Sequence, residues 1–362
     1  MHFIPHMLAY VGIFLYLCAL FCIYTYMANV TYLIGAGASA GKRVKTNGQI
    51  IEGLPCVKEI PRRLNNLAGD FRSNVNNFGG ADRSEMERLV STINALYEAS
   101  KRHSTIDTYA KKLFLRGEKK SFELTEAYLA FYFIIEQILL KPDSRYDTFL
   151  ANILDNKLNI PDNINIISWN YDSQFEIAYR EYSQNKQLPI ASKMAWGQND
   201  NPKILKVNGT AAFENLRDVP TLRANYPSLS SSSFGRGEDY IDVNRMRYIL
   251  DLFRKLQKDE TGKTQLSFAF DGECNELLYK TVDKIVGATD VLVVVGYTFP
   301  FFNREIDRRL MNKLDNLRTK IYIQDLYPER IKQSIKAVLP DFNEANFVLL
   351  NDVDQFFLPP EL

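Results

Sequence analysis

The sequence predicts an α/β protein with a parallel β-sheet and helices on both of its faces. Three observations lead to this prediction. The apolar run 30–34 breaks into small residues at Gly35, several later apolar runs of strand length end in polar residues, and helical periodicity fills much of the region between them. A buried strand that enters a glycine turn is typical of nucleotide-binding α/β folds.

The glycine turn after this first strand fits more than one nucleotide-binding motif. Gly35, Gly37 and Ala40 match the loose dinucleotide fingerprint Gly-x-Gly-x-x-Gly/Ala. The pair Gly41-Lys42 matches the end of the NTPase phosphate-loop motif in part, but the Ser or Thr that would bind magnesium does not follow it. Residues 43–63 contain no convincing apolar strand, so a dehydrogenase-type unit is not favoured either.

Composition fits a globular protein and excludes some functional classes. Of the 362 residues, 46% are hydrophobic and 24% are charged, which is close to the average for folded domains. The formal net charge of +1 argues against a dedicated nucleic-acid-binding protein. The four cysteines form no Cys-x-x-Cys pair, so we expect neither a structural zinc nor a disulfide framework.

The N-terminal segment differs from the rest of the chain. Residues 7–26 are uncharged and mostly apolar, and they are numerous enough to span a bilayer as a helix. If they span the inner membrane, the first cations after them, Lys42 and Arg43, would keep the large domain in the cytoplasm. Three alternatives stay open: residues 1–26 are a misassigned start or dispensable extension of a cytoplasmic protein that begins near Met27, a membrane anchor, or a helix packed on the domain.

Helical periodicity dominates the region that follows the glycine turn. Apolar residues recur at spacings of three and four over 84–100, 105–116 and 124–140, which predicts three helices. The last of them is apolar almost all round, so we expect it to be buried. Residues 65–83 carry Asn-Asn, Gly-Asp and Gly-Gly pairs and are predicted to form a loop.

These patterns predict a domain with an insertion. Residues 27–80 and 159–362 are expected to form the sheet domain, and residues 81–158 are expected to form an inserted helical subdomain between its two parts.

Four later apolar runs resemble strands whose carboxyl ends carry polar side chains. They are residues 164–168, 204–207, 290–295 and 321–324. Asn170 and Asp172 follow the first, Asn208 follows the second, Thr298 follows the third, and Asp325 follows the fourth. Ligands of open parallel sheets bind beyond the carboxyl ends of the strands, so these residues are expected to face one crevice together with the glycine turn.

Five short motifs together resemble the NAD-binding domain of sirtuins, and most of all its bacterial sirtuin-like branch. In chain order they are Gly-Ala-Gly-Ala-Ser at 35–39, Gly-Leu-Pro at 53–55, Trp-Asn-Tyr-Asp at 169–172, Lys-Val-Asn-Gly at 206–209 and Gly-Tyr-Thr at 296–298. The resemblance covers about residues 28–350. It implies a Rossmann-like sheet whose glycine loop holds the pyrophosphate of NAD.

The resemblance also implies roles for single residues. Asn170 would position the ribose or the attacking water, and Asp172 would contact the carboxamide of nicotinamide. A structural alternative for both is an Asx turn that caps the helix expected after Asp172.

The rest of the implied NAD site lies on three other turns. The residues that would contact phosphates through backbone and hydroxyl groups are Gly35, Ala36, Gly37 and Ser39. Gly296 and Thr298 would lie under the phosphates and the adenosine ribose, and Asp325 would approach the adenine.

Two departures from the sirtuin pattern bear on activity. The absent cysteine pairs argue against the zinc ribbon of protein deacylases. Asn208 stands where the family has a catalytic histidine, and a neutral amide cannot accept a proton at pH 7. Of the three histidines in the chain, His2 and His6 lie in the N-terminal segment. His103 either folds over the crevice as a substitute base or is a solvated residue near a helix N-terminus.

The function expected from the resemblance is NAD+ hydrolysis to nicotinamide and ADP-ribose, which similar proteins perform in anti-phage defence. A non-catalytic protein that binds or senses NAD or an ADP-ribose derivative is the alternative. A membrane-tethered interaction module, resting on residues 7–26, is a third hypothesis. By resemblance, a separate trigger protein and a homo-oligomer are expected partners, and no nucleic acid is expected.

Overall fold

The computed structural model describes most of the chain after the N-terminal segment. The described residues are 27–41, 45–46, 49–50, 53–140, 142–183, 190–192, 202–216, 243–271, 276–315 and 318–362. The predictions for residues 7–26, His2 and His6 concern residues outside this part.

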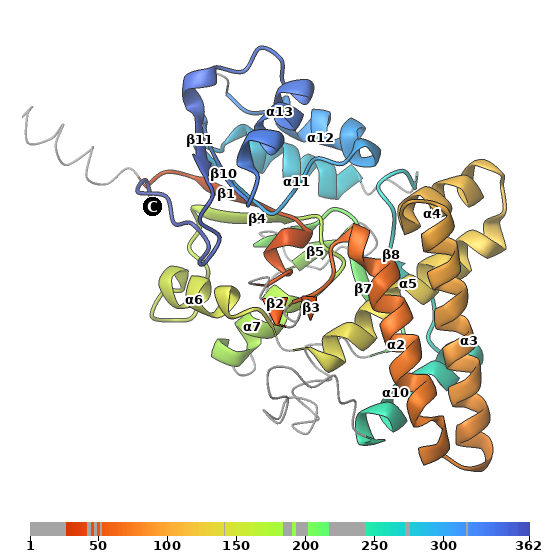
Figure 1. The fold of residues 1–362 in the computed structure, drawn as a ribbon. Coiled ribbons are helices and arrows are strands. Elements are labelled where there is room, and N and C mark those ends of the chain that lie inside the picture. The colour runs from red at the N-terminus through yellow and green to blue at the C-terminus, as the bar shows by residue number, and fades with distance from the viewer. Residues whose placement is uncertain are drawn as a thin grey trace, which may run out of the picture.

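The centre of the fold is a seven-stranded sheet with the strand order β11-β10-β9-β1-β4-β6-β5. All neighbouring strands run parallel, which confirms the predicted Rossmann-like α/β fold (Figure 1). The strands are β1 (Val30–Ile34), β4 (Ile164–Ser168), β5 (Ile190–Ser192), β6 (Ile204–Lys206), β9 (Val291–Val295), β10 (Lys320–Gln324) and β11 (Phe347–Leu350).

The strand register brings the carboxyl ends of the central strands to one edge of the sheet. Ile34 at the end of β1 pairs with Ser168 of β4 on one side and with Val295 of β9 on the other. Ser168 in turn pairs with Lys206, and Val295 pairs with Gln324. The chain runs outward from β1 to β4 and later returns to β9 on the opposite side, so the turns after β1 and β9 flank the switch point where such sheets bind ligands.

Helices cover both faces of the sheet, as predicted. Helices α11 (Glu276–Gly287), α12 (Arg304–Met311) and α13 (Pro328–Val338) share a core with Leu33 and Val294. Helices α6 (Ser144–Ile153) and α7 (Gln174–Ser183) share the opposite core with Tyr32 and Val293. Figure 1 shows α11, α12 and α13 above the sheet and α6 and α7 below it. Neighbouring residues of one strand point to opposite faces, which is why Tyr32 and Leu33 enter different cores.

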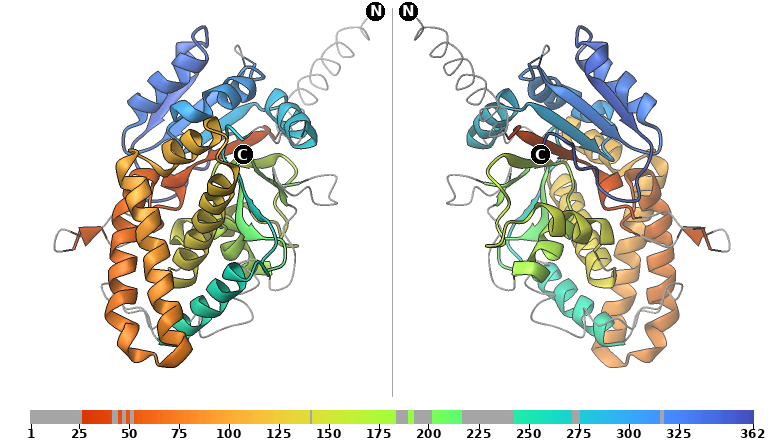
Figure 2. Two further views of the ribbon diagram at one scale, coloured as in Figure 1. Left: turned by 90° about the vertical axis from the view of Figure 1, so that its right-hand side faces the viewer. Right: turned by 90° about the vertical axis from the view of Figure 1, so that its left-hand side faces the viewer.

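A second body of helices lies beside the carboxyl edge of the sheet. It contains α2 (Ile60–Asn74), α3 (Gly80–Arg102), α4 (Ile106–Leu115), α5 (Lys119–Leu139) and α10 (Val243–Gln257). Figure 2 shows the long helices α2 and α3 side by side. The three helices predicted from periodicity correspond to α3, α4 and α5, and α5 is buried as expected.

The loop predicted over 65–83 is wrong, because α2 and the start of α3 occupy most of it. The apolar residues of α2 that enter the core are Ile60, Leu64, Leu67, Ala68 and Phe71. Their spacing of three and four residues buries one face, while the Asn and Gly pairs fall on or near the solvent side.

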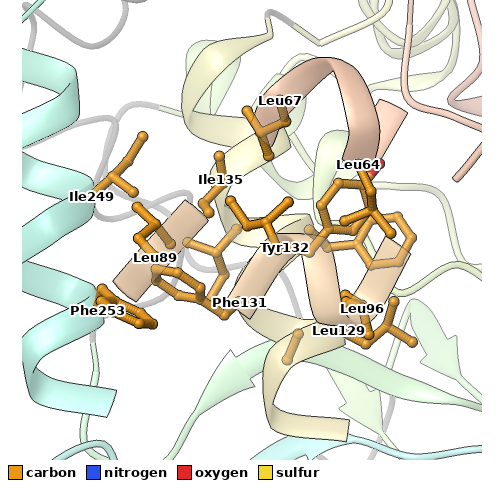
Figure 3. Close-up of a cluster of buried hydrophobic side chains, with 14 of the residues drawn as sticks. Leu64, Leu67, Leu89, Leu96, Leu129, Phe131, Tyr132, Ile135, Ile249 and Phe253 are labelled. Atoms are coloured by element: carbon orange, nitrogen blue, oxygen red, sulfur yellow. The ribbon is translucent and has the colours of Figure 1, made fainter. Parts of the chain in front are cut away.

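One apolar core joins these helices (Figure 3). In Figure 3, Leu64 and Leu67 of α2 and Phe253 of α10 lie around Tyr132 and Phe131 of α5. The strand pair β7 (Gly209–Phe213) and β8 (Thr264–Leu266) contributes to the same core. The insertion boundaries at 81 and 158 stay a prediction. Helices α2 and α10 share an apolar core with α3, α4 and α5, whereas α6 shares a core with the sheet.

A short antiparallel pair, β2 (Lys45–Thr46) and β3 (Gln49–Ile50), follows the glycine loop. Within the part of the chain that the structure describes, no helix has both the length and the apolar character needed to cross a bilayer.

Removing a side chain of α10 is expected to destabilise the helical body. Phe253 is 0% exposed, so Phe253→Ala should lower the free energy of unfolding by about 3–5 kcal/mol in urea titrations. The control Leu115→Ala removes a side chain that is 72% exposed and should cost less than about 0.5 kcal/mol. Equal losses in the two variants would contradict a packed position for α10.

Candidate functional site

The glycine loop after β1 is bound to the turn after β9 by direct backbone contact. The Gly35 amide donates to the Val295 carbonyl at 3.0 Å, and the Gly37 amide donates to the Gly296 carbonyl at 2.9 Å. A Cβ on Gly37 would lie 2.6 Å from Gly296 Cα, and one on Gly35 would lie 2.7 Å from Tyr297 Cα. Gly296 also has a φ of +59°. The glycines are therefore required by the packing of one loop on the other.

This packing determines which loop amides can meet a phosphate. The amides of Gly35 and Gly37 donate to the carbonyls of Val295 and Gly296, and the Ala38 and Ser39 amides donate within the 3-10 turn Ala36–Ala38. Ala36 makes no hydrogen bond through its amide to any described residue, and Ala36 and Gly37 are the partly exposed apex of the loop. A phosphate at this loop would meet the Ala36 amide first.

Asn170, which follows β4, is held by the glycine loop. Its Nδ2 donates to the Gly35 carbonyl at 3.0 Å and to Ser39 Oγ at 3.3 Å. Both amide hydrogens are thereby engaged, while Oδ1 accepts no hydrogen bond from a described residue. Asn170 is thus oriented to present an acceptor, which suits a ribose hydroxyl or a water molecule.

A buried hydrogen-bond chain links the glycine loop to Asp172. Ser39 Oγ donates to Asp172 Oδ1 at 3.0 Å, so the Tyr146 hydroxyl, 2.9 Å from Ser39 Oγ, is the donor to Ser39. The amide of Gln174 also donates to Asp172 Oδ1 at 3.1 Å. The Asx turn considered for Asp172 is therefore present, and the same carboxylate also faces the glycine loop.

Lys206, at the end of β6, lies beneath this chain. It is 2% exposed, and its Nζ donates to the Asp172 carbonyl and, at 3.0 Å, to Glu176 Oε1. Burial raises the pKa of Asp172 above its usual value, although the positive charge of Lys206 and the hydrogen bonds from Gln174 and Ser39 oppose that rise. Asp172 consequently holds a proton more readily than an ordinary aspartate.

Asn208 is also oriented so that it presents an acceptor. Its Nδ2 donates to the Trp169 carbonyl at 3.4 Å, and its buried Oδ1 has no hydrogen-bond partner among the described residues. Trp169 stacks on Tyr297 with ring centroids 5.3 Å apart, which fixes the carbonyl that orients Asn208. A buried acceptor without a donor is costly, so this position favours a bound water or ligand hydroxyl.

Three of the predicted residues, Thr298, Asp325 and His103, lie outside the hydrogen-bond network of Ser39, Asn170 and Asp172. Thr298 is exposed, and Asp325 accepts a hydrogen bond from the Tyr327 amide in a turn that opens α13. His103 ends α3, and its ring stacks on Tyr109 at 5.1 Å. Within the described part of the chain, no contact joins His103 to Asn170 or Asn208.

Two acidic residues near these turns, Asp107 and Asp307, are not predicted from the sequence. Burial raises the pKa of Asp107 to about 6, and this carboxylate interacts electrostatically with Tyr171. Asp307 of α12 is 1% exposed, and its Oδ1 and Oδ2 accept a hydrogen bond from the Tyr297 hydroxyl at 2.8 and 3.0 Å. Burial raises the pKa of Asp307 well above its usual value.

Other residues at the site were also missed from the sequence. Arg145, Tyr146 and Glu176 carried no signal of their own. Lys206 lies within the Lys-Val-Asn-Gly motif at 206–209, where the resemblance implies a role for position 208 and none for Lys206. Among the described residues, no three His, Cys, Asp or Glu side chains gather where they could bind a metal ion.

Comparison with known proteins does not assign the chain to a family. No protein-family model matches the sequence, and no curated protein matches it.

Substitution of Gly296 tests the contact between the two loops. Gly296→Ala should lower the free energy of unfolding by about 2–5 kcal/mol, because the positive φ and a Cβ only 2.4 Å from Gly37 Cα both oppose a side chain. Gly117→Ala is the matched control, since Gly117 has a φ of +68° but nothing within 4 Å of an added Cβ. It should cost only about 1–2 kcal/mol of backbone strain. A Gly296 variant no less stable than the Gly117 variant would contradict the contact.

The burial of Asp307 predicts a pH dependence. Because its folded pKa is raised, the folded state keeps a proton that the unfolded state releases, so its contribution to stability is present at acid pH and lost as the pH rises. Above pH 4, the unsubstituted protein should therefore lose stability relative to Asp307→Asn as the pH rises. The expected relative loss of unfolding free energy is up to about 1.4 kcal/mol per pH unit. Urea titrations from pH 4 to 8 that show a constant difference would contradict it.

Proposed function

We propose that the protein is a sirtuin-like NAD+ hydrolase that cleaves NAD to nicotinamide and ADP-ribose. One observation carries the proposal: Asn170 is hydrogen-bonded to both Gly35 and Ser39, so the turn after β4 and the glycine loop form one structure at the switch point of the sheet. This is the place where a parallel sheet binds a dinucleotide. A role in anti-phage defence is part of the proposal and rests on the resemblance to sirtuin-like proteins.

The arrangement suits the departure of nicotinamide. In that step the bond between C1′ of the ribose and the pyridinium nitrogen breaks, its electron pair goes to the nitrogen, and positive charge develops on the sugar. Amide oxygens at Asn170 and Asn208 would stabilise this charge and hold hydroxyl groups without carrying a full negative charge themselves. Asp172, with its raised pKa, would supply a hydrogen bond to the carboxamide of nicotinamide.

Hydrolysis is completed when a water oxygen bonds to C1′ and its proton passes to solvent. Asn208 cannot remove that proton, but Oδ1 of Asn208 could align the water, and the developing cation is reactive enough that positioning is the main requirement. The absence of a histidine at this position is therefore compatible with hydrolysis, and it argues against reactions that need a ribose hydroxylate.

Asn170 is the residue whose removal should affect cleavage most. With the full-length protein and NAD, Asn170→Ala should lower the rate of nicotinamide release by about 10²–10³-fold, as expected when one group that stabilises developing charge is lost. The measurement is chromatography of nicotinamide and ADP-ribose over time.

Asn163→Ala is the matched control for this variant. Asn163 precedes the opposite end of the same strand, where its Nδ2 donates to the Ala28 carbonyl at 3.0 Å. Its substitution should leave the rate unchanged. Equal nicotinamide release from the Asn170 variant and the unsubstituted protein would remove Asn170 from the mechanism.

A second candidate function is binding of NAD or an ADP-ribose derivative without cleavage. The observation in its favour is the neutral amide of Asn208, which offers an acceptor but no base. This candidate expects saturable heat of binding for ADP-ribose in calorimetry and no nicotinamide from NAD under the same conditions. Turnover of NAD would exclude it, and so would the absence of binding.

A further inference from the structure

The first turn of α6 reaches the glycine loop from below and provides residues that the proposed chemistry does not use. Arg145 is 3% exposed, and its Nη2 donates to the Gly37 carbonyl at 3.1 Å and to the Ala38 carbonyl at 3.0 Å. Its neighbour Tyr146 donates to Ser39 Oγ. Two consecutive residues of one helix therefore hold three consecutive residues of the loop.

The guanidinium of Arg145 is fixed on several sides. Asp143, the N-cap of α6, accepts from Nε at 2.9 Å and from Nη2 at 2.6 Å. Nη1 donates to the Val353 carbonyl at 3.2 Å, and the guanidinium carbon lies 5.1 Å from the centre of the Phe356 ring. A buried ion pair of this kind adds little net stability, because desolvation offsets the attraction.

Arg145 completes the hydrogen bonding of the loop carbonyls. The carbonyls of Gly35, Ala36, Gly37 and Ser39 accept backbone amides, and those amides belong to Ala38, Ser39, Ala40 and Leu54. The buried Ala38 carbonyl accepts from Arg145 and from no other donor among the described residues. Every carbonyl from Gly35 to Ser39 thus accepts a hydrogen bond, and the partly exposed apex presents the Ala36 amide.

An anion approaching this apex would meet an N–H group and no unpaired carbonyl oxygen. Carbonyl oxygens repel phosphate oxygens, while oriented amides attract them. Arginine can bind two carbonyls and a carboxylate simultaneously with a planar group, whereas the single ammonium of lysine cannot reproduce that geometry.

We infer that Arg145 is a positioning residue for a pyrophosphate-bearing ligand, because it holds the carbonyls of Gly37 and Ala38 away from the anion site at Ala36. The inference rests on the proposed function, since it takes the ligand to be the ADP-ribose part of NAD. It does not require that NAD be cleaved.

The test is the affinity of the full-length protein for ADP-ribose, measured by calorimetry. Arg145→Lys keeps the charge and Arg145→Met removes it. Loss of a supporting group of this kind should weaken ADP-ribose binding by about 10- to 100-fold, by analogy with the second shell of metal sites. If cleavage of NAD is detected, KM should rise by a similar factor while kcat changes less than about twofold, because the reacting bond is distant from the loop carbonyls.

Arg63→Met is the matched control, since Arg63 also forms an ion pair with a buried partner, Glu136, at 2.7 Å, but belongs to the helical body. Thermal unfolding of all variants gives the folded fraction. The control should bind ADP-ribose as the unsubstituted protein does, even if its melting temperature falls as far as that of the Arg145 variants. If Arg145→Met does not fold, Arg145→Lys alone decides.

Three results would overturn the inference. The first is that both folded Arg145 variants bind ADP-ribose within about twofold of the affinity of the unsubstituted protein. The second is that the Arg63 control loses as much affinity for ADP-ribose as the Arg145 variants do. The third is that the unsubstituted protein does not bind ADP-ribose. The last would also overturn the proposed function. ADP-ribose binding that depends on Arg145, without release of nicotinamide from NAD, would overturn the hydrolase proposal and support the inference.

Discussion

The backbone contact between the glycine loop and the turn after β9 is the constraint on which the rest of the site depends. Gly37 and Gly296 approach so closely that neither tolerates a Cβ. Their contact joins the two turns that flank the switch point, directs the Gly35 carbonyl toward Asn170, and leaves Ala36 at the partly exposed apex of the loop. The in-register strands β1 and β9 beneath them make this approach reproducible, because their last residues are neighbours in the sheet.

The polar residues around that contact form a connected network. Tyr146, Ser39 and Asp172 are joined by successive hydrogen bonds, and Lys206 supports the same turn from below. Buried polar groups are stable only when their partners are in place, so such a network fixes one geometry. At this edge the amide oxygens of Asn170 and Asn208 accept no hydrogen bond from a described residue. Acceptors held in this way are suited to a sugar on which positive charge develops.

The sequence predicts the local features of this fold well and its long-range contacts poorly. Continuous apolar runs and glycine turns identify β1 and β9 because parallel strands are buried on both faces. Helix α2 was missed because its Asn and Gly pairs are typical of loops, although its buried face is regularly spaced. Arg145 could not be predicted, since it meets the glycine loop across more than 100 residues of chain, and nothing in the sequence near it indicates a partner.

If the proposed function is right, the glycine loop and Asn170 bind one dinucleotide across the switch point. A crystal structure of the full-length protein with ADP-ribose tests it most directly. We expect the pyrophosphate at the Ala36 amide and the ribose that carried nicotinamide within hydrogen-bond reach of Asn170 Oδ1. ADP-ribose bound elsewhere on the protein, or an empty loop in crystals saturated with the ligand, would contradict dinucleotide binding across the switch point.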